Sequence, residues 1–189
     1  MAEKRKKKEE EKLGWQKSVL LYAHDMLYLL LIVMLLFLLV FRIIVVSGGS
    51  MRMTLLDGDY LLLLNNTFYH TPQRGDIVVI SKESFDNGKP IVKRVIATEG
   101  QTVDIDFDDG VVYVDGKALD EPYVNEPVHD RENFEGKITV PEGCVFVMGD
   151  NRNASTDSRD SRLGMVDERY ILGHVQSVVF PISDFGTVK

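Results

Sequence analysis

The sequence predicts a mostly β protein, with one N-terminal transmembrane helix followed by an outer β-rich domain. Two observations lead to this prediction. An apolar run extends from Met26 to Val46, and short apolar runs recur through the rest of the 189 residues. The roughly 140 residues after the long run are enough for one sizeable hydrophobic core. We therefore expect a tail at 1–17, an anchor at 18–46 and one domain at 47–189.

The long apolar run has the dimensions of a membrane span. It contains 21 residues with a single charge, Arg42. At about 1.5 Å per residue, a helix of this length spans roughly 31 Å, close to the ~30 Å hydrocarbon core of a bilayer. Arg42 lies near the end of the run, where its side chain can reach the lipid headgroups. A cleavable signal peptide has a shorter apolar core, so a retained anchor is favoured.

Charge is distributed unevenly on the two sides of this run. Residues 1–50 hold eight Lys and Arg against five Asp and Glu, whereas residues 51–189 hold 14 against 24. Seven of the basic residues precede the run, and Arg52 alone lies within twenty residues after it. The positive-inside rule therefore predicts a cytoplasmic basic tail and an extracytoplasmic domain. So acidic a domain lacks the basic surface that binds phosphate, which disfavours a nucleic-acid partner.

Seven apolar runs in the outer domain have the length and the Val and Ile content of strands. They are 60–65, 76–81, 91–97, 102–107, 111–116, 144–149 and 174–180. One segment between two of them, 104–110, superficially resembles a calcium loop. Asp109 stands where such a loop needs glycine. A hairpin turn that ends at Gly110 is therefore the better interpretation.

The residues that many hydrolases use are poorly placed here. The histidines, His24, His70, His129 and His174, lack the spacing of metal ligands, and the sequence has no HExxH or paired CxxC motif. Cys144 is the single cysteine, so it forms no internal disulfide, and its apolar neighbours indicate a small packed side chain. The GxSxG elbow of serine hydrolases is also missing. The sequence implies no cofactor and no metal.

A serine and a lysine remain as candidates for chemistry. Ser50 follows the membrane run, and Lys93 lies within a predicted strand. Alternation along that strand places Lys93 on one face with Val95 and Ala97, where loss of hydration lowers the pKa of an amine. A neutral lysine is able to take the proton of a serine hydroxyl. A backbone N–H of Gly49 or Ser50 would then donate to the oxyanion.

Each of the two residues has a simpler interpretation when it is taken alone. Ser50 is then a polar residue that follows an anchor. Lys93 is then a charge that protects an edge strand against aggregation. Only the pair favours a nucleophile with its base.

Four segments in order carry a family resemblance. They are SGGSMRMTLLDGD (47–59), GDIVVI (75–80), KRVIATEGQTV (93–103) and VPEGCVFVMGDNRNASTDSR (140–159), and a fifth, VYVDGKALDEPYV (112–124), is similar to a connecting hairpin. Together they resemble the bacterial type I signal peptidases of Gram-positive type, which are membrane-anchored serine/lysine endopeptidases. The resemblance implies a signal-peptidase-like catalytic domain, with Ser50 as the catalytic serine and Lys93 as the general base.

The last of these segments implies supporting residues that the pattern alone would assign to a solvated loop. By resemblance, Ser155 would hydrogen-bond Lys93 and orient its amine. Asp157 and Arg159 would form a structural ion pair nearby, and Asp150 would belong to the same network.

The sequence departs from the family pattern at two places. Met53 stands where the family has proline, which would hold φ near −65°. The stretch 97–101 replaces a Pro-Gly-Asp turn. Gly48 offers no hydroxyl to the oxyanion, as in many relatives of Gram-positive type.

The function that the resemblance implies is the removal of N-terminal signal peptides from exported proteins, a step in protein secretion. The partners would be signal-peptide-bearing preproteins and the lipid bilayer, close to the protein translocation machinery. Substrates would carry small side chains one and three residues before the cleaved bond. Two alternatives stay open. One is a narrow-substrate relative that processes one pilin-like precursor, and the other is a catalytically inactive relative that binds signal peptides.

Overall fold

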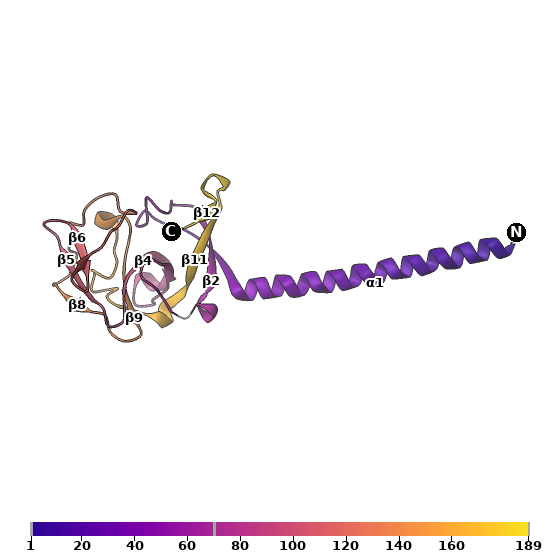
Figure 1. The fold of residues 1–189 in the computed structure, drawn as a ribbon, viewed down its shortest axis with the longest axis horizontal. Helices are drawn as coiled ribbons and strands as arrows, with labels where there is room; N and C mark the ends of the chain where they lie inside the picture. The colour runs from indigo at the N-terminus through magenta and orange to yellow at the C-terminus, as the bar shows by residue number, and fades with distance from the viewer. Residues whose placement is uncertain (1, 70, 189) are drawn as a thin grey trace. The chain divides into compact units, whose positions relative to one another are not determined.

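The structure is a computed structural model that describes residues 2–69 and 71–188. The chain forms two compact units, and the boundary between them lies between Val40 and Phe41. The first unit is a helix and the second is rich in β structure (Figure 1). The predicted fold class, an N-terminal apolar helix followed by a mostly β domain, is confirmed.

The first unit is the single helix α1, Ala2–Val40. Its segment Gly14–Val40 is 27 residues long and includes an 18-residue window with a mean hydropathy of 2.4, so it is long and apolar enough to cross a membrane. Large apolar side chains on every side of this segment are exposed, such as Leu20 at 73% and Tyr22 at 75%. A helix that is apolar all round needs an apolar environment to cover it. Such a helix is suited to anchor the chain in a membrane.

The helix ends earlier than the sequence suggested. We expected the anchor to continue to Val46, but residues Phe41–Val45 form strand β1. This strand pairs antiparallel with β2, Tyr60–Asn65, and Arg42 lies opposite Leu63 in the ladder. β-Branched residues at 43–46 favour a strand, and hydropathy alone cannot distinguish the end of a membrane helix from an apolar strand.

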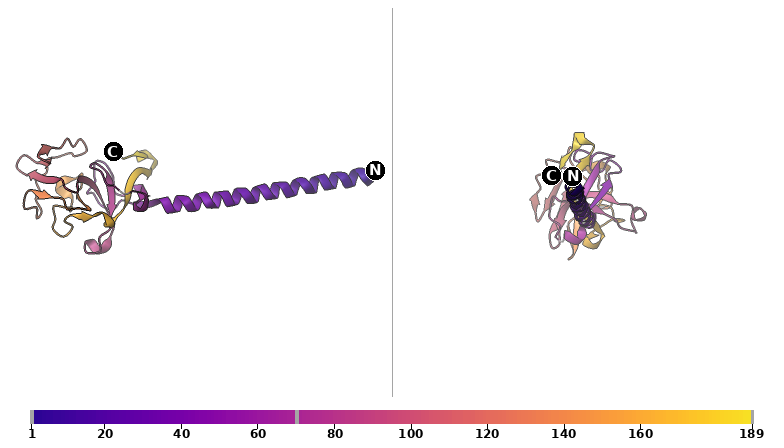
Figure 2. Two further views of the ribbon diagram at one scale, coloured as in Figure 1. Left: turned by 60° about the horizontal axis from the view of Figure 1, so that its bottom comes forward. Right: turned by 90° about the vertical axis from the view of Figure 1, so that its right-hand side faces the viewer.

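The second unit contains two antiparallel sheets. The larger sheet has the order β1-β2-β11-β3-β4-β9-β10, with β12 paired to β11, and the smaller has the order β7-β6-β5-β8. The remaining strands of the larger sheet are β3 (Ile77–Ile80), β4 (Ile91–Thr98), β9 (Cys144–Met148), β10 (Val166–Asp167), β11 (Ile171–Phe180) and β12 (Gly186–Thr187). Those of the smaller sheet are β5 (Thr102–Asp106), β6 (Val111–Val114), β7 (Lys117–Ala118) and β8 (Ile138–Thr139). Short 3-10 turns connect them at Asn66–Phe68, Asp86–Gly88, Arg152–Ala154, Glu168–Tyr170 and Ile182–Asp184. Figures 1 and 2 place β5, β6 and β8 at the opposite side of this unit from β2 and β11.

All seven predicted strand segments contain an observed strand. The strands that the sequence did not indicate are β1 and four of two residues each, too short to show a period. The predicted hairpin is also present, because β5 and β6 pair on either side of a turn that ends at Gly110, where φ is 71°. Only glycine fits there, since an added Cβ would overlap Pro127.

Three buried apolar clusters stabilise the β unit. The cluster beside the segment after β1 contains Met51 and Leu55, each only 1% exposed. Burial of two such side chains contributes about 3–6 kcal/mol of hydrophobic free energy. The segment that follows Ser50 is therefore tied to the core, although it contains no regular strand.

Candidate active site

Lys93 lies in the interior of the larger sheet. Its strand β4 pairs with β3 on one side, where Val78 is opposite Lys93, and with β9 on the other. The residue is only 3% exposed. An edge-strand lysine would lie at the border of the sheet and in water, so that simpler interpretation is wrong.

Ser50 and Lys93 are brought together by this fold. The Nζ atom of Lys93 lies 2.6 Å from the Oγ atom of Ser50, across 43 residues of sequence. Among the described residues, Ser50 is the one hydrogen-bond partner of this amine. As an ammonium Lys93 donates to Oγ, and as a neutral amine it can accept the proton of the hydroxyl.

Burial lowers the pKa of Lys93 from its ordinary value of 10.5 to about 8. The nearby carboxylates of Asp157 and Glu132 oppose this change by favouring the charged amine, whereas Arg159 adds to it. Because desolvation is the largest effect, a substantial fraction of the amine is neutral near pH 8. The predicted environment for a proton acceptor is therefore present.

The segment that carries Ser50 is an irregular turn between β1 and β2. Its internal bonds include Arg52 N to Gly49 O at 3.1 Å and Leu55 N to Met51 O at 2.9 Å. The turn begins at Gly48, where φ is 97°, a conformation that side chains rarely adopt. Glycine at position 48 therefore allows the backbone conformation of the turn, and it also leaves the site without a side-chain hydroxyl at this position.

Residues Asp150 and Asn151 hold this turn from outside. Asn151 donates its backbone N–H to Ser50 O at 2.9 Å and its side-chain amide to Gly49 O at 2.9 Å. Thr54 donates its hydroxyl to Asp150 at 2.5 Å. These bonds fix the backbone before Ser50 and the residues that follow it. Sequence reasoning missed Asn151, although it lies inside the GDNR segment that indicated Asp150.

Gly149 allows this close approach. A Cβ built at this position would lie 2.5 Å from Ser50 O and would overlap the side chain of Ser155. The backbone of 149–151 can therefore reach the serine turn only because residue 149 has no side chain.

Asp150 is fully buried and is paired with Arg94, the residue after the proposed base. The guanidinium donates to both carboxylate oxygens, at 2.8 Å and 2.7 Å. It also stacks on the ring of Tyr123 with its Cζ 3.9 Å from the centroid. Strand β4 thus places Lys93 beside Ser50 on one face. On its opposite face it places Arg94 beside Asp150, the residue that holds Thr54. Strand alternation was the signal from which Arg94 could have been found.

The expected ion pair between Asp157 and Arg159 is present and buried. Arg159 donates to both oxygens of Asp157 at 2.9 Å each. Asp157 also accepts from Gly149 N at 3.0 Å and from the hydroxyl of Ser155 at 2.9 Å. Ser155 therefore donates to Asp157 here, where the resemblance implied a bond to Lys93. The Ser155 hydroxyl has one proton to donate, and the carboxylate two residues away is a stronger acceptor for it than an amine.

The backbone donors of the serine turn are available to a substrate. Within residues 2–69 and 71–188, the structure gives neither Gly49 N–H nor Ser50 N–H an acceptor, whereas Gly48 N–H donates to Asp57 at 2.7 Å. Donors without an internal partner at the nucleophile are what an oxyanion site requires.

Met53 adopts a backbone conformation that proline cannot reach. Its φ is 102° and its side chain is 64% exposed. Because proline holds φ near −65°, a family-type proline would require a different turn after Ser50. Positive φ costs a non-glycine residue on the order of 1–3 kcal/mol, which the buried neighbours on the turn offset.

The two described histidines of the β unit, His129 and His174, contact residues other than Ser50 and Lys93. His129 bonds the carbonyl of Phe107 at 2.8 Å, and His174 stacks on Tyr69 with its Nε2 3.5 Å from Asp76. The prediction for His70 concerns a residue outside those that the structure describes. In the described part of the chain, no three His, Cys, Asp or Glu side chains are grouped as metal ligands would be.

Comparison with known proteins identifies the class of molecule. The family described as "Signal peptidase, peptidase S26" matches residues 19–180. The chain is 41% identical over 143 residues to the probable signal peptidase I-1 of Synechocystis, an alignment that covers 72% of this chain and 69% of that protein. It is 38% identical over 142 residues to signal peptidase I of Bacillus licheniformis, covering 71% and 74%.

A solved structure of a signal peptidase I from Enterococcus faecalis is also similar. It is 35% identical, covers 55% of this chain and 96% of its own, and superposes with a TM-score of 0.44. The family match and the identities show that this chain belongs to the signal peptidase family, peptidase S26.

Proposed function

We propose that this chain removes signal peptides from exported proteins, with Ser50 as the nucleophile and Lys93 as the general base. Membership of the signal peptidase family supports the reaction. The observation that supports the residues most directly is the 2.6 Å contact between Ser50 Oγ and a buried Lys93. A buried neutral lysine beside a serine supplies a nucleophile without histidine or metal.

In the acylation step, Lys93 Nζ takes the proton of Ser50 Oγ as the oxygen attacks the scissile carbonyl carbon. The carbonyl oxygen becomes an oxyanion that accepts from the backbone N–H of Ser50 and Gly49. Collapse of this intermediate breaks the C–N bond. The Lys93 ammonium gives its proton to the leaving amine, which is the new N-terminus of the mature protein.

In the deacylation step, a water molecule replaces the amine. Lys93 takes one proton of this water as the oxygen attacks the ester carbonyl. When the ester bond breaks, the ammonium returns the proton to Ser50 Oγ. The signal peptide leaves as a carboxylic acid that gives its proton to water, and the enzyme regains its starting state.

Asp150, Ser155, Asp157 and Arg159 support the pair without contacting the substrate in this proposal. Each buried carboxylate is paired with a buried arginine, Asp150 with Arg94 and Asp157 with Arg159. The two ion pairs stabilise the backbone around Ser50 and Lys93. Because each negative charge has a positive partner, desolvation remains the largest effect on the pKa of Lys93.

The substrate is proposed to bind as an extended strand beside the segments that carry the pair, with small side chains one and three residues before the cleaved bond. We further propose a single-pass topology, with the tail at 1–17 in the cytoplasm and the β unit that begins at Phe41 outside, near the translocation machinery. The charge distribution across the apolar helix supports this orientation.

The inactive and narrow-substrate alternatives are not favoured. Both proposed catalytic side chains are retained at hydrogen-bond distance, and relatives named signal peptidase I match most of the chain. Met53 was the feature that kept the inactive alternative open. Its unusual φ changes the turn after Ser50 and leaves the contact with Lys93 intact.

The test is cleavage of a preprotein with an Ala-x-Ala site by the full chain in detergent. Wild type should release the mature protein with its N-terminus directly after the second alanine, as read by mass spectrometry. Ser50→Ala should release none, while Ser161→Ala, at an exposed serine away from the pair, should match wild type. Retained cleavage by Ser50→Ala would rule out the proposed nucleophile.

A further inference from the structure

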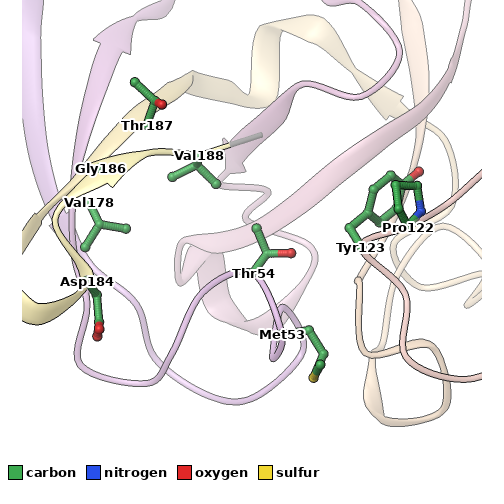
Figure 3. A pocket seen from close by; sticks show the side chains of 9 residues that line it. All are labelled: Met53, Thr54, Pro122, Tyr123, Val178, Asp184, Gly186, Thr187 and Val188. Atoms are coloured by element: carbon green, nitrogen blue, oxygen red, sulfur yellow. The ribbon is translucent and has the colours of Figure 1, made fainter.

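A cavity of about 470 Å³ lies on the β unit beside the serine turn. Figure 3 shows Val178 and Asp184 on one side of it, Pro122 and Tyr123 on the opposite side, and Thr54 with Met53 between them. Thr54 is held by Asp150, and Tyr123 is held by the Arg94 stack. The floor and one wall are therefore fixed by the network that positions Ser50.

The lining of the cavity is mostly apolar and includes a negatively charged side chain. Apolar groups of valine, proline and methionine side chains and the tyrosine ring form most of its surface. Asp184 is the one charged residue among the described residues that line it, and this carboxylate is exposed. A side chain with an aliphatic stem and a cationic end matches such a lining, because the stem covers the apolar walls and the end remains in water near the carboxylate.

The cavity lies within reach of the bond that Ser50 attacks. Its nearest lining residue on the turn, Met53, is three residues after Ser50, so the two Cα atoms are at most about 11 Å apart. An extended substrate advances about 3.3 Å per residue. The side chain of the second or third residue from the cleaved bond therefore reaches the cavity.

The chemistry of the substrate decides the side of the bond. The residues one and three before the cleaved bond are proposed to be small, the residue between them points to the opposite face of an extended strand, and the residues further back belong to an apolar signal peptide. A cavity with room for a long side chain beside a carboxylate matches none of these. The cavity is therefore assigned to the other half of the substrate, the start of the mature protein.

We propose that this cavity binds the side chain of the second or third residue after the cleaved bond, and that Asp184 makes it prefer lysine or arginine over glutamate or aspartate. This inference rests on the proposed function. Asp184 is a specificity residue here and takes no part in bond breaking.

The experiment compares peptides with one Ala-x-Ala site and Lys, Gln or Glu at the second or third position after it. The ratio of kcat/KM for Lys over Glu is measured with the full chain in detergent, for wild type, Asp184→Asn and Asp184→Lys. An exposed charge pair changes such a ratio by about 2- to 5-fold. Wild type should favour Lys by that amount, Asp184→Asn should approach equality, and Asp184→Lys should favour Glu.

The matched control is Asp108→Lys, an equal change of charge at an exposed residue in the β5–β6 turn. It should leave the ratio as in wild type. A shift as large as that of Asp184→Lys would show a general charge effect and overturn the assignment, as would an unchanged ratio in Asp184→Lys with cleavage intact. Absence of cleavage by wild type would instead overturn the proposed function, on which the assignment rests.

Discussion

Ser50 and Lys93 reach the same place by different structural means. Lys93 lies in a strand with a neighbour on each side, so the sheet itself fixes its position. Ser50 lies in an irregular turn that donates a hydrogen bond to Asp150 and accepts hydrogen bonds from Asn151, about a hundred residues further along the chain. The base is positioned by regular secondary structure, whereas the nucleophile depends on a few distant side chains. Substitutions should therefore be able to affect one without the other.

The largest effect is expected when the base itself is removed. Lys93→Met keeps a similar volume and takes away the amine, so kcat/KM should fall by at least about 10³-fold. The free energy of unfolding should stay equal or rise, because no buried amine has to lose its hydration. Denaturant unfolding and peptide cleavage measure the two quantities. The exposed Lys89→Met serves as control, and activity above a tenth of wild type in Lys93→Met would contradict the role of the base.

The pair that holds the nucleophile turn should contribute most to stability. Asp150→Ala leaves Arg94 buried without its carboxylate partner, and loss of one member of a buried pair costs about 3–5 kcal/mol. Arg169→Ala breaks an ion pair that is exposed on the arginine side, and it should leave the unfolding midpoint unchanged. Chemical denaturation of both variants would show equal losses if burial of the first pair were unimportant.

The protonation of Lys93 should appear in two pH profiles. The folded-state pKa of about 8 is below the ordinary 10.5, so the folded protein binds fewer protons between these values. The free energy of unfolding should therefore increase with pH in that window, by about 3 kcal/mol in total, and this increase should be absent in Lys93→Met. Below about pH 8 the amine is charged in both the folded and the unfolded protein, so it no longer makes the free energy of unfolding depend on pH. Cleavage should rise through pH 8 to a plateau, and a flat profile from pH 6 to 9 would contradict a neutral base.

The smallest effect is expected from loosening the turn. Asn151→Ala removes the bond to Gly49 O and should lower the free energy of unfolding by about 1 kcal/mol and kcat about 10-fold. The pH at half-maximal activity should not move, since Lys93 is held separately. Asn153→Ala removes bonds to the loop at 127–130 instead and should retain wild-type kcat. Equal loss of kcat in both variants would argue against a specific hold on the nucleophile.

Regular structure was predictable from the sequence, and contacts between distant irregular segments were not. The length and the Val and Ile content of the apolar runs located the main strands, alternation put Lys93 on an apolar face, and the fold class and family are confirmed. The helix end at Val40 could not be read, because an apolar strand continues the same hydropathy. The hydrogen bonds of Asn151, and the bond from Ser155 to Asp157, depend on backbone geometry in irregular segments. The alternation of apolar and polar residues carries no information about that geometry.

The central claim is that Ser50 and Lys93 act as one unit. Its most direct test is kcat/KM on an Ala-x-Ala preprotein for wild type, Ser50→Ala, Lys93→Met and the double variant. If the lysine works only through the serine, each single variant should lose as much as the double variant does. Losses that multiply in the double variant, or cleavage that survives either single change, would show that the two residues act independently and would contradict the account.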